Sequence, residues 1–189
     1  GFPFEQFIAE IFKTMGYTNV RTGVAAQGKC APHEVDVMAE HDENKHVAAE
    51  VKFHNSLGIK TDLKVALYVH ARFEDLRDSN HHIDEGWLIT NTRFTRNVVQ
   101  FSKCSNLKLI GWDYPNGRGL EVLIDEAHVH PITALTTLDT KDKRTLLDNN
   151  IVLCRQLRGD PTQLERHGIS VRERDSVIDE VNRLCTIGA

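Results

Sequence analysis

The sequence predicts an α/β fold, in which a mixed β-sheet is flanked by helices and is followed by a small helical region. Three observations support this prediction. Helix-like and strand-like patterns alternate over residues 1–112, and two of the strand-like runs form a hairpin pattern. Residues 113–189 hold helical patterns without strands. The 189 residues suffice for one domain with an appendage.

The predicted elements of the first part follow in the order α-β-β-β-α-β-α-β. Residues 3–15 carry apolar side chains at helical spacing, and residues 19–25 form a weak strand pattern. Two alternating runs, residues 34–40 and 46–53, enclose a polar turn at residues 41–45, which is typical of a β-hairpin. The remaining elements expected here are a helix over residues 59–76, a strand over 86–90, a helix over 94–104 and a strand over 107–112. A meander followed by crossover units implies a mixed sheet with helices on both faces.

The second part, residues 113–189, is expected to hold three helices, over residues 139–149, 161–167 and 171–185. Asp139 is a suitable N-cap for the first of these helices. Two roles stay open for this region, contact with DNA and dimerisation, alongside the ordinary packing of small helices.

The composition excludes several classes of protein. The net charge is 23 − 27 = −4, so the chain is not a polycation and would need a local basic surface to bind nucleic acid. No apolar run approaches the length of a membrane span. The four cysteines are widely spaced without a CxxC motif, which favours reduced thiols in a cytoplasmic protein. Because a helical pattern starts immediately at Gly1, we expect that an upstream domain is missing from this chain.

The hairpin carries the residues with the clearest chemistry. Glu50 and Lys52 are two apart on a strand, so their side chains share a face at about 6–7 Å. In an antiparallel hairpin the numbers of opposed residues have a constant sum. If Asp36 faces Glu50, this sum is 86 and the hairpin is centred on Glu43, inside the polar turn. We therefore expect Asp36, Glu50 and Lys52 in one cluster, although a slip of one residue would move Asp36 to the other face.

Two carboxylates with a lysine suit the metal-assisted hydrolysis of a phosphodiester. Mg²⁺ prefers oxygen ligands, neutralises charge on the phosphodiester and lowers the pKa of a bound water. Lys52 could orient or deprotonate that water, or stabilise the pentavalent phosphorus. The alternative stays open, because alternating Glu-Val-Lys strands also occur as solvent-facing surfaces.

A carboxylate of the first helix is a further candidate. At about 100° per residue, the apolar stripe of this helix is centred near Ile8 and Met15. Glu5 lies at the border of the buried face, whereas Glu10 turns towards solvent. Glu5 is therefore expected to reach the cluster and support the metal or the water, with a solvated helix acid as the alternative.

An ordered set of motifs resembles the catalytic domain of the Mrr-like restriction endonucleases, members of the PD-(D/E)xK nuclease superfamily. The motifs are Phe4-Glu5, Met15-Gly16-Tyr17, Val35-Asp36-Val37, Glu50-Val51-Lys52, Trp87-Leu88-Ile89-Thr90-Asn91 and Phe94-Thr95. The resemblance covers about residues 3–112 and implies a restriction-endonuclease-like fold and a metal-dependent endonuclease acting on DNA. It implies that Asp36 and Glu50 bind Mg²⁺ or Mn²⁺, that Lys52 is the catalytic lysine and that Glu5 is the first-helix acid.

Two departures from the family pattern bear on the substrate. Many Mrr-like members carry Gln where this chain has Glu50, and the Glu form is similar to the archaeal Holliday-junction resolvases. The Gly-rich loop usual before the aspartate is replaced by residues 28–34. A structure-selective, junction-resolvase-like nuclease and a non-cleaving DNA-binding or regulatory module on the same fold therefore remain alternatives.

Basic side chains around the cluster are candidates for DNA contact, which would add the counterion-release part of DNA affinity. A solvated surface is the alternative for each of them. These candidates are Lys29, His33, His54, Lys60 and Lys64. Because two cuts on a duplex usually require two active sites, we also expect a homodimer.

Overall fold

The computed structural model describes residues 2–41, 45–56, 58–79 and 83–186. The chain divides into two compact units, Gly1–Leu123 and Ile124–Ala189. All strands of the described residues lie in the first unit, and the described part of the second unit is helical. No helix in the described ranges is both long and apolar enough to cross a bilayer.

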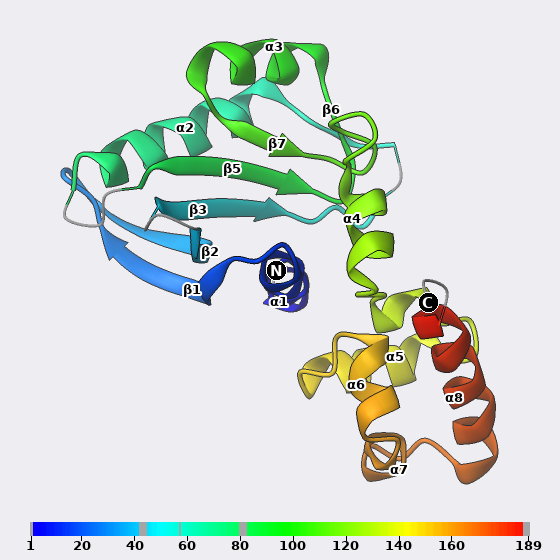
Figure 1. Cartoon of the computed structure of the whole chain (residues 1–189). Helices are drawn as coiled ribbons and strands as arrows, with labels where there is room; N and C mark the ends of the chain where they lie inside the picture. The colour runs from blue at the N-terminus through cyan, green and yellow to red at the C-terminus, as the bar shows by residue number, and fades with distance from the viewer. Residues whose placement is uncertain (1, 42–44, 57, 80–82, 187–189) are drawn as a thin grey trace. The chain divides into compact units, whose positions relative to one another are not determined.

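The first unit contains a five-stranded mixed sheet, as predicted, with the strand order β1-β2-β3-β5-β7 (Figure 1). Strands β1, β2 and β3 are antiparallel neighbours, whereas β3, β5 and β7 run parallel. The parallel pairs follow from the helical crossovers that separate these strands in the sequence. The strands are β1 (Thr18–Gln27), β2 (Pro32–His41), β3 (Lys45–Lys52), β5 (Glu85–Thr90) and β7 (Lys108–Ile110).

The β2–β3 hairpin has the predicted register. Its backbone pairs run from Val37↔Ala49 to His41↔Lys45, and each pair of numbers sums to 86. The predicted centre at Glu43 lies outside the described residues. This register places the carboxyl end of β3, with Glu50 and Lys52, in the interior of the sheet between β2 and β5.

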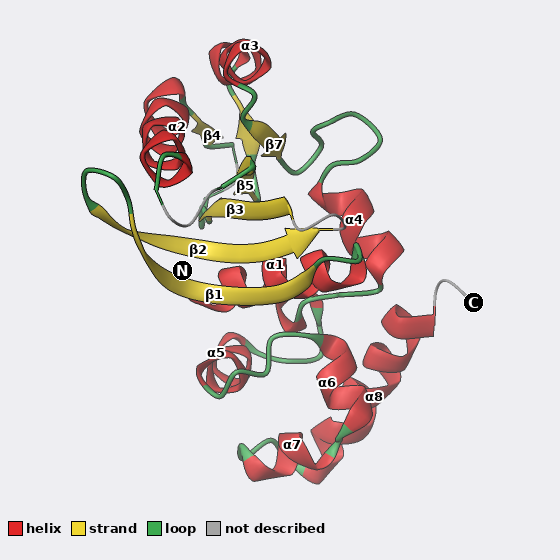
Figure 2. Cartoon of the chain, turned by 60° about the vertical axis from the view of Figure 1, so that its left-hand side comes forward, coloured by secondary structure: helices red, strands yellow, loops and turns green. Residues whose placement is uncertain are grey.

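Helices cover both faces of the sheet (Figure 2). Helix α1 (Phe2–Thr14) packs on one face, where the Phe12 ring meets the Trp87 ring edge-on at 5.6 Å. Helices α2 (Leu63–Arg77) and α3 (Arg96–Ser105) pack on the other face. The core on that side includes Met38, Ala48, Ala66, Val69, Phe73, Leu76, Leu88, Val98 and Leu109, all of them buried. The site therefore lies between two helical layers.

Helix α2 begins later than the predicted residue 59. Residues 60–61 form a short strand, β4 (Lys60–Thr61), which pairs in parallel with β6 (Arg93–Phe94). Asp62 then caps the helix, because its side chain accepts a hydrogen bond from the backbone N–H of Val65 at 3.3 Å. The prediction failed here because β4 exists only through its pairing with a strand about thirty residues away in the chain.

The second unit is a cluster of short helices with its own apolar core. Its elements are η1 (Ile132–Ala134), α5 (Thr140–Asp148), α6 (Cys154–Gly159), α7 (Thr162–Arg166) and α8 (Val171–Thr186), and α4 (Leu120–Ala127) spans the division between the units. Asp139 caps α5 as predicted, accepting from the N–H of Asp142 at 2.7 Å. Helix α6 escaped prediction because six residues are too few to show a helical period.

One buried acid anchors α8 to the rest of the second unit. The Glu180 carboxylate accepts hydrogen bonds from the backbone N–H and the hydroxyl of both Thr136 and Thr137, at 2.6–3.0 Å. Although burial alone would raise the pKa of Glu180, these hydrogen bonds outweigh it and lower the pKa from 4.5 to about 2. The glutamate therefore stays ionised and fixes the loop after η1.

Candidate active site

Glu50, near the carboxyl end of β3, is a buried and doubly paired acid. The residue is only 3% exposed. One of its carboxylate oxygens lies 2.6 Å from Lys52 Nζ, and the other accepts a hydrogen bond from Arg72 Nη1. Burying a carboxylate this deeply is costly unless it is paired with charged groups. The solvent-facing alternative considered for this strand is therefore wrong for Glu50.

Asp36, in β2, reaches the same place through a different interaction. The described backbone pairing between β2 and β3 ends at Val37↔Ala49, and the Asp36 side chain continues it. Its Oδ2 accepts a hydrogen bond of 2.7 Å from the backbone N–H of Val51. Because Val51 stands between Glu50 and Lys52, the structure brings together the three residues that the hairpin arithmetic predicted.

Glu5 approaches the cluster from the first turn of α1. Its pKa is raised above 4.5, chiefly by burial and next by repulsion from Asp36, with smaller contributions from Glu34 and Glu50. These repulsions place its carboxylate on the acidic side of the site. Glu10 instead forms an ion pair with Lys13 at 2.7 Å, away from these acids. The sequence-based preference for Glu5 over Glu10 agrees with this arrangement.

Arg72 of α2 is a site residue that the sequence did not predict. Its side chain is only 12% exposed. Besides Glu50, Nη1 donates to the carbonyl of Glu34 at 2.9 Å, and Nη2 donates to the hydroxyl of Tyr68, over whose ring the guanidinium lies at 4.7 Å. The only signal in the sequence was the Tyr68–Arg72 spacing of one helical turn, which does not reveal which strand the helix covers.

Two of the predicted DNA contacts are engaged at the far end of α2. His33 Nε2 lies 2.7 Å from Asp75 Oδ2, and Lys29 Nζ lies 3.3 Å from Asp78 Oδ2. The hydrogen bond from His33, helped by the backbone N–H groups of Cys30 and Ala31, lowers the pKa of Asp75 to about 2. Both basic side chains are thus held by acids at the C-terminal end of α2 rather than by the acids of the sheet.

The other three predicted contacts come after β3 in the chain. Lys60 and Lys64 are exposed, and neither has an ion-pair partner among the residues that the structure describes. His54 Nε2 lies 3.4 Å from the hydroxyl of Thr61. The Asn91 side chain accepts from the backbone N–H of His54 at 2.8 Å and donates to its carbonyl at 2.9 Å, which ties the chain after β3 to the end of β5.

The donor chemistry of the cluster fits a hard divalent cation. Asp36 and Glu50 supply carboxylate oxygens, which Mg²⁺ and Mn²⁺ prefer. Within the described ranges, no three His, Cys, Asp or Glu residues are arranged to hold a metal ion by themselves. The two acids would therefore rely on backbone, water or substrate oxygens to complete the coordination, as Mg²⁺ sites commonly do.

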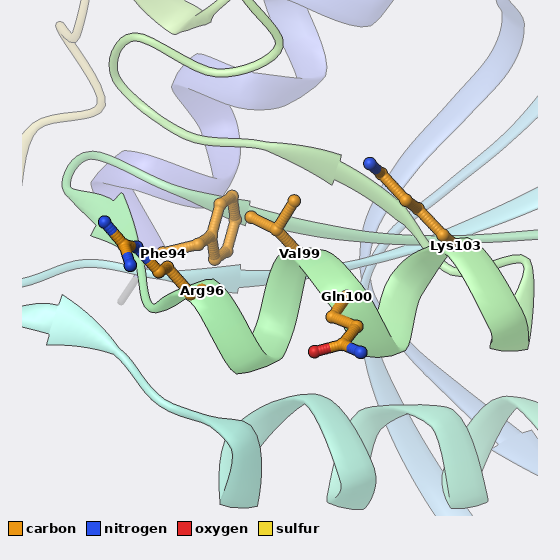
Figure 3. A pocket seen from close by; sticks show the side chains of 5 residues that line it. All are labelled: Phe94, Arg96, Val99, Gln100 and Lys103. Atoms are coloured by element: carbon orange, nitrogen blue, oxygen red, sulfur yellow. The ribbon is translucent and has the colours of Figure 1, made fainter.

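A pocket of about 320 Å³ lies along α3 and does not include the acids. Figure 3 shows Phe94 and Val99 between Arg96 at one end of the helix and Lys103 at the other. Gln100 completes the lining. Neither cation has an ion-pair partner in the described part of the chain. The pocket thus offers positive charge to an anion but no group for hydrolysis.

A carboxylate pair and a lysine on the inner strands of a mixed sheet, with helices on both faces, define a nuclease of the restriction-endonuclease class. The Mrr catalytic-domain model, described as "Restriction endonuclease", matches residues 1–114. The chain belongs to this family, as its motifs predicted. A second model, "AF1548-like, C-terminal", matches residues 130–185.

The chain resembles known proteins over nearly its whole length. An uncharacterized protein of Archaeoglobus fulgidus is 33% identical over 178 residues, which cover 94% of this chain and 99% of that protein. The crystal structure of the protein of unknown function AF1548 has a TM-score of 0.80 at 32% identity and covers 97% of both chains. A repair endonuclease from Pyrococcus abyssi is far more distant, with 15% identity, a TM-score of 0.43 and coverage of 56% of this chain and 45% of its own.

Proposed function

We propose that this protein is a metal-dependent endonuclease that hydrolyses phosphodiester bonds of DNA. The observation that carries the proposal is the buried Glu50, which is paired with Lys52 beside Asp36. A stable fold gains little from burying an acid with two cations, because hydrophobic side chains of similar volume would pack as well. A catalytic role of the cluster explains the arrangement better than a role in stability does.

Each residue of the cluster has a distinct role in this proposal. Asp36 and Glu50 would hold Mg²⁺ or Mn²⁺, which supplies charge neutralisation at the phosphodiester and makes a water more acidic. Lys52 is 37% exposed on its side chain, so its ammonium can reach both Glu50 and an incoming phosphate. It orients the attacking water and stabilises negative charge on the phosphorus oxygens. Glu5, whose carboxylate lies on the acidic side of the cluster, supports the metal or the water.

DNA is the proposed partner. Lys60 and Lys64, exposed and unpaired in the described ranges, provide counterion-release contacts, together with His54. Lys29 and His33 would join only by exchanging their contacts with Asp78 and Asp75. We also propose a homodimer, because cutting both strands of a duplex requires two such sites.

Plasmid cleavage tests the proposal. Supercoiled plasmid and junction DNA are incubated with the protein in Mg²⁺, Mn²⁺ or EDTA, and binding is measured in parallel. We expect the protein to cleave DNA in Mg²⁺ or Mn²⁺ but not in EDTA. Lys52→Met and Asp36→Asn should each lower the cleavage rate by about 100-fold or more while DNA binding is retained. Lys108→Met is the matched control, because Lys108 also pairs with a glutamate, Glu85, at 2.8 Å outside the site.

Three outcomes separate the alternatives. Cleavage of junctions without cleavage of plasmid assigns a structure-selective nuclease. DNA binding without cleavage of any substrate assigns a non-cleaving module. Equal activity in Lys52→Met and Lys108→Met refutes the site.

A further inference from the structure

The segment that follows the catalytic strand exposes an unusual amount of apolar surface. Five large hydrophobic side chains are exposed in the described part of the chain, and four of them lie between residues 53 and 68. These four are Phe53, Ile59, Leu67 and Tyr68, with 49%, 45%, 46% and 57% of their surface exposed. Exposed apolar side chains that are concentrated in one segment, here together called the patch, indicate a binding surface.

Tyr68 is linked to Glu50 through Arg72. Its hydroxyl accepts a hydrogen bond from Arg72, whose other terminal nitrogen bonds to Glu50. The guanidinium also lies over the Tyr68 ring, which restrains the ring while more than half of the residue stays exposed. A restrained aromatic ring binds a flat ligand at a low cost in conformational entropy.

Phe53 lies on the other side of the acids. It follows Lys52 in the chain, and its ring packs against the Phe4 ring of α1 at 5.1 Å while half of the residue stays exposed. Helices α1 and α2 cover opposite faces of the sheet (Figure 2). Phe53 and Tyr68 therefore flank the Glu50–Lys52 pair, one on the α1 side and one on the α2 side.

Cations alternate with these apolar side chains along the same segment. Lys52, Lys60 and Lys64 are partly or fully exposed, and the two latter lysines have no ion-pair partner in the described ranges. Positive charges that track a backbone, combined with aromatic rings that stack on bases, are the two requirements for binding single-stranded nucleic acid. In an intact duplex the base faces are stacked on one another, so exposed rings would find no partner there.

We propose that Phe53 and Tyr68 stack on unpaired bases next to the scissile phosphate, so that the substrate is DNA with single-stranded character. This inference rests on the proposed nuclease function and names its substrate class. Charge complementarity favours DNA over a second copy of this acidic chain as the occupant of the patch, because its cations would find their counterpart in the phosphate backbone.

Binding in EDTA, which prevents cleavage, tests the inference on the full chain. Fluorescence anisotropy compares a single-stranded oligonucleotide, a duplex with a single-stranded flap and a blunt duplex. We expect Phe53→Ala and Tyr68→Ala each to weaken binding of the first two by about 5- to 100-fold, with little change for the blunt duplex. Tyr68→Phe keeps the ring and should bind like the wild type. Trp112→Ala, which removes an exposed ring outside the segment, should also bind like the wild type.

A stacking signal and the oligomeric state complete the test. A 2-aminopurine in the flap should be quenched on binding to the wild type and less so on binding to either alanine variant. If both alanine variants bind each of the three DNAs as tightly as the wild type does, the inference is overturned. Metal-dependent plasmid cleavage in the same preparation would then leave the proposed function intact. A shift from dimer to monomer in Tyr68→Ala with unchanged binding of single strands also overturns it, assigning the patch to contact between copies.

Discussion

Replacing Arg72 by Met tests whether Glu50 is truly a buried and paired charge. The substitution keeps an unbranched apolar stem but removes the guanidinium. Glu50 would then keep only Lys52 as its charged partner. Removing one member of a buried ion pair costs about 3–5 kcal/mol.

Two features of the structure move the expected cost to the lower limit of that range or just below it. Lys52 still neutralises one carboxylate oxygen of Glu50. In addition, Arg72 Nε is buried without a hydrogen-bond partner among the described residues, and removing an unsatisfied group of this kind returns about 1 kcal/mol. We therefore expect Arg72→Met to lower the free energy of unfolding of the first unit by about 2–3 kcal/mol.

Urea unfolding followed by tryptophan fluorescence measures this change, because both tryptophans of the chain, Trp87 and Trp112, lie in the first unit. Arg93→Met is the matched control, since Arg93 pairs with Asp113 at 2.8 Å but both side chains are largely exposed. Exposed pairs contribute little, so we expect a change of about 0.5 kcal/mol or less.

A double variant makes the test specific for charge. Glu50→Gln combined with Arg72→Met leaves no unpaired carboxylate in the interior and should recover part of the lost stability, giving a coupling of about 1 kcal/mol or more. Equal costs for Arg72→Met and Arg93→Met, or strict additivity in the double variant, would refute the buried pair.

Three further predictions concern other parts of the chain. Glu180→Gln should destabilise the second unit, because an amide nitrogen would face N–H and O–H donors. The lowered pKa, reduced for solvent screening, corresponds to about 2 kcal/mol at neutral pH, which hydrogen exchange measures. Gly86→Ala should cost about 1–3 kcal/mol, because the added Cβ would lie 2.4 Å from the Phe73 ring, whereas Gly159→Ala meets nothing and should be neutral in thermal unfolding. Asp75→Ala should speed alkylation of Cys30 at pH 8, because the hydrogen bond to Asp75 is the main cause of the raised thiol pKa.

Each of these predictions has a clear contrary result. The contribution of Glu180 should be complete above pH 4.5, because its folded-state pKa is depressed, and should be lost as the pH falls towards 2. A wild-type second unit whose stability does not change over that interval would contradict the assignment. Equal stabilities of Gly86→Ala and Gly159→Ala would mean that β5 and α2 do not pack as described. Unchanged alkylation of Cys30 would remove Asp75 as its partner.

The predictable part of the site is the part that strand geometry controls. Asp36, Glu50 and Lys52 could be brought together from the sequence because pairing in a hairpin fixes a constant sum, and the polar turn supplied its value. The deep burial of Glu50 could not be predicted, since an alternating strand does not show whether a helix covers its polar face.

The contacts of α2, the helix between β3 and β5, could not be predicted from the sequence for the same reason. Arg72 meets Glu50 only because α2 crosses the sheet at one particular angle and rotation. His33 and Lys29, expected near the site, instead meet Asp75 and Asp78 at the end of that helix. Side-chain partners distant in sequence depend on how layers pack, and periodicity within one element carries no information about that packing.

Asn91 has a consequence for how the lysine is held. The main chains of β3 and β5 stop pairing at Lys52↔Thr90. The side-chain amide of Asn91 extends this pairing, because it accepts a hydrogen bond from the N–H of His54 and donates one to its C=O. The chain can therefore leave the sheet after Lys52 while the hydrogen bonds between β3 and β5 stay formed. The backbone that carries the Lys52 ammonium group is thus held in place by hydrogen bonds. The position of this group is therefore restricted before any nucleic acid binds.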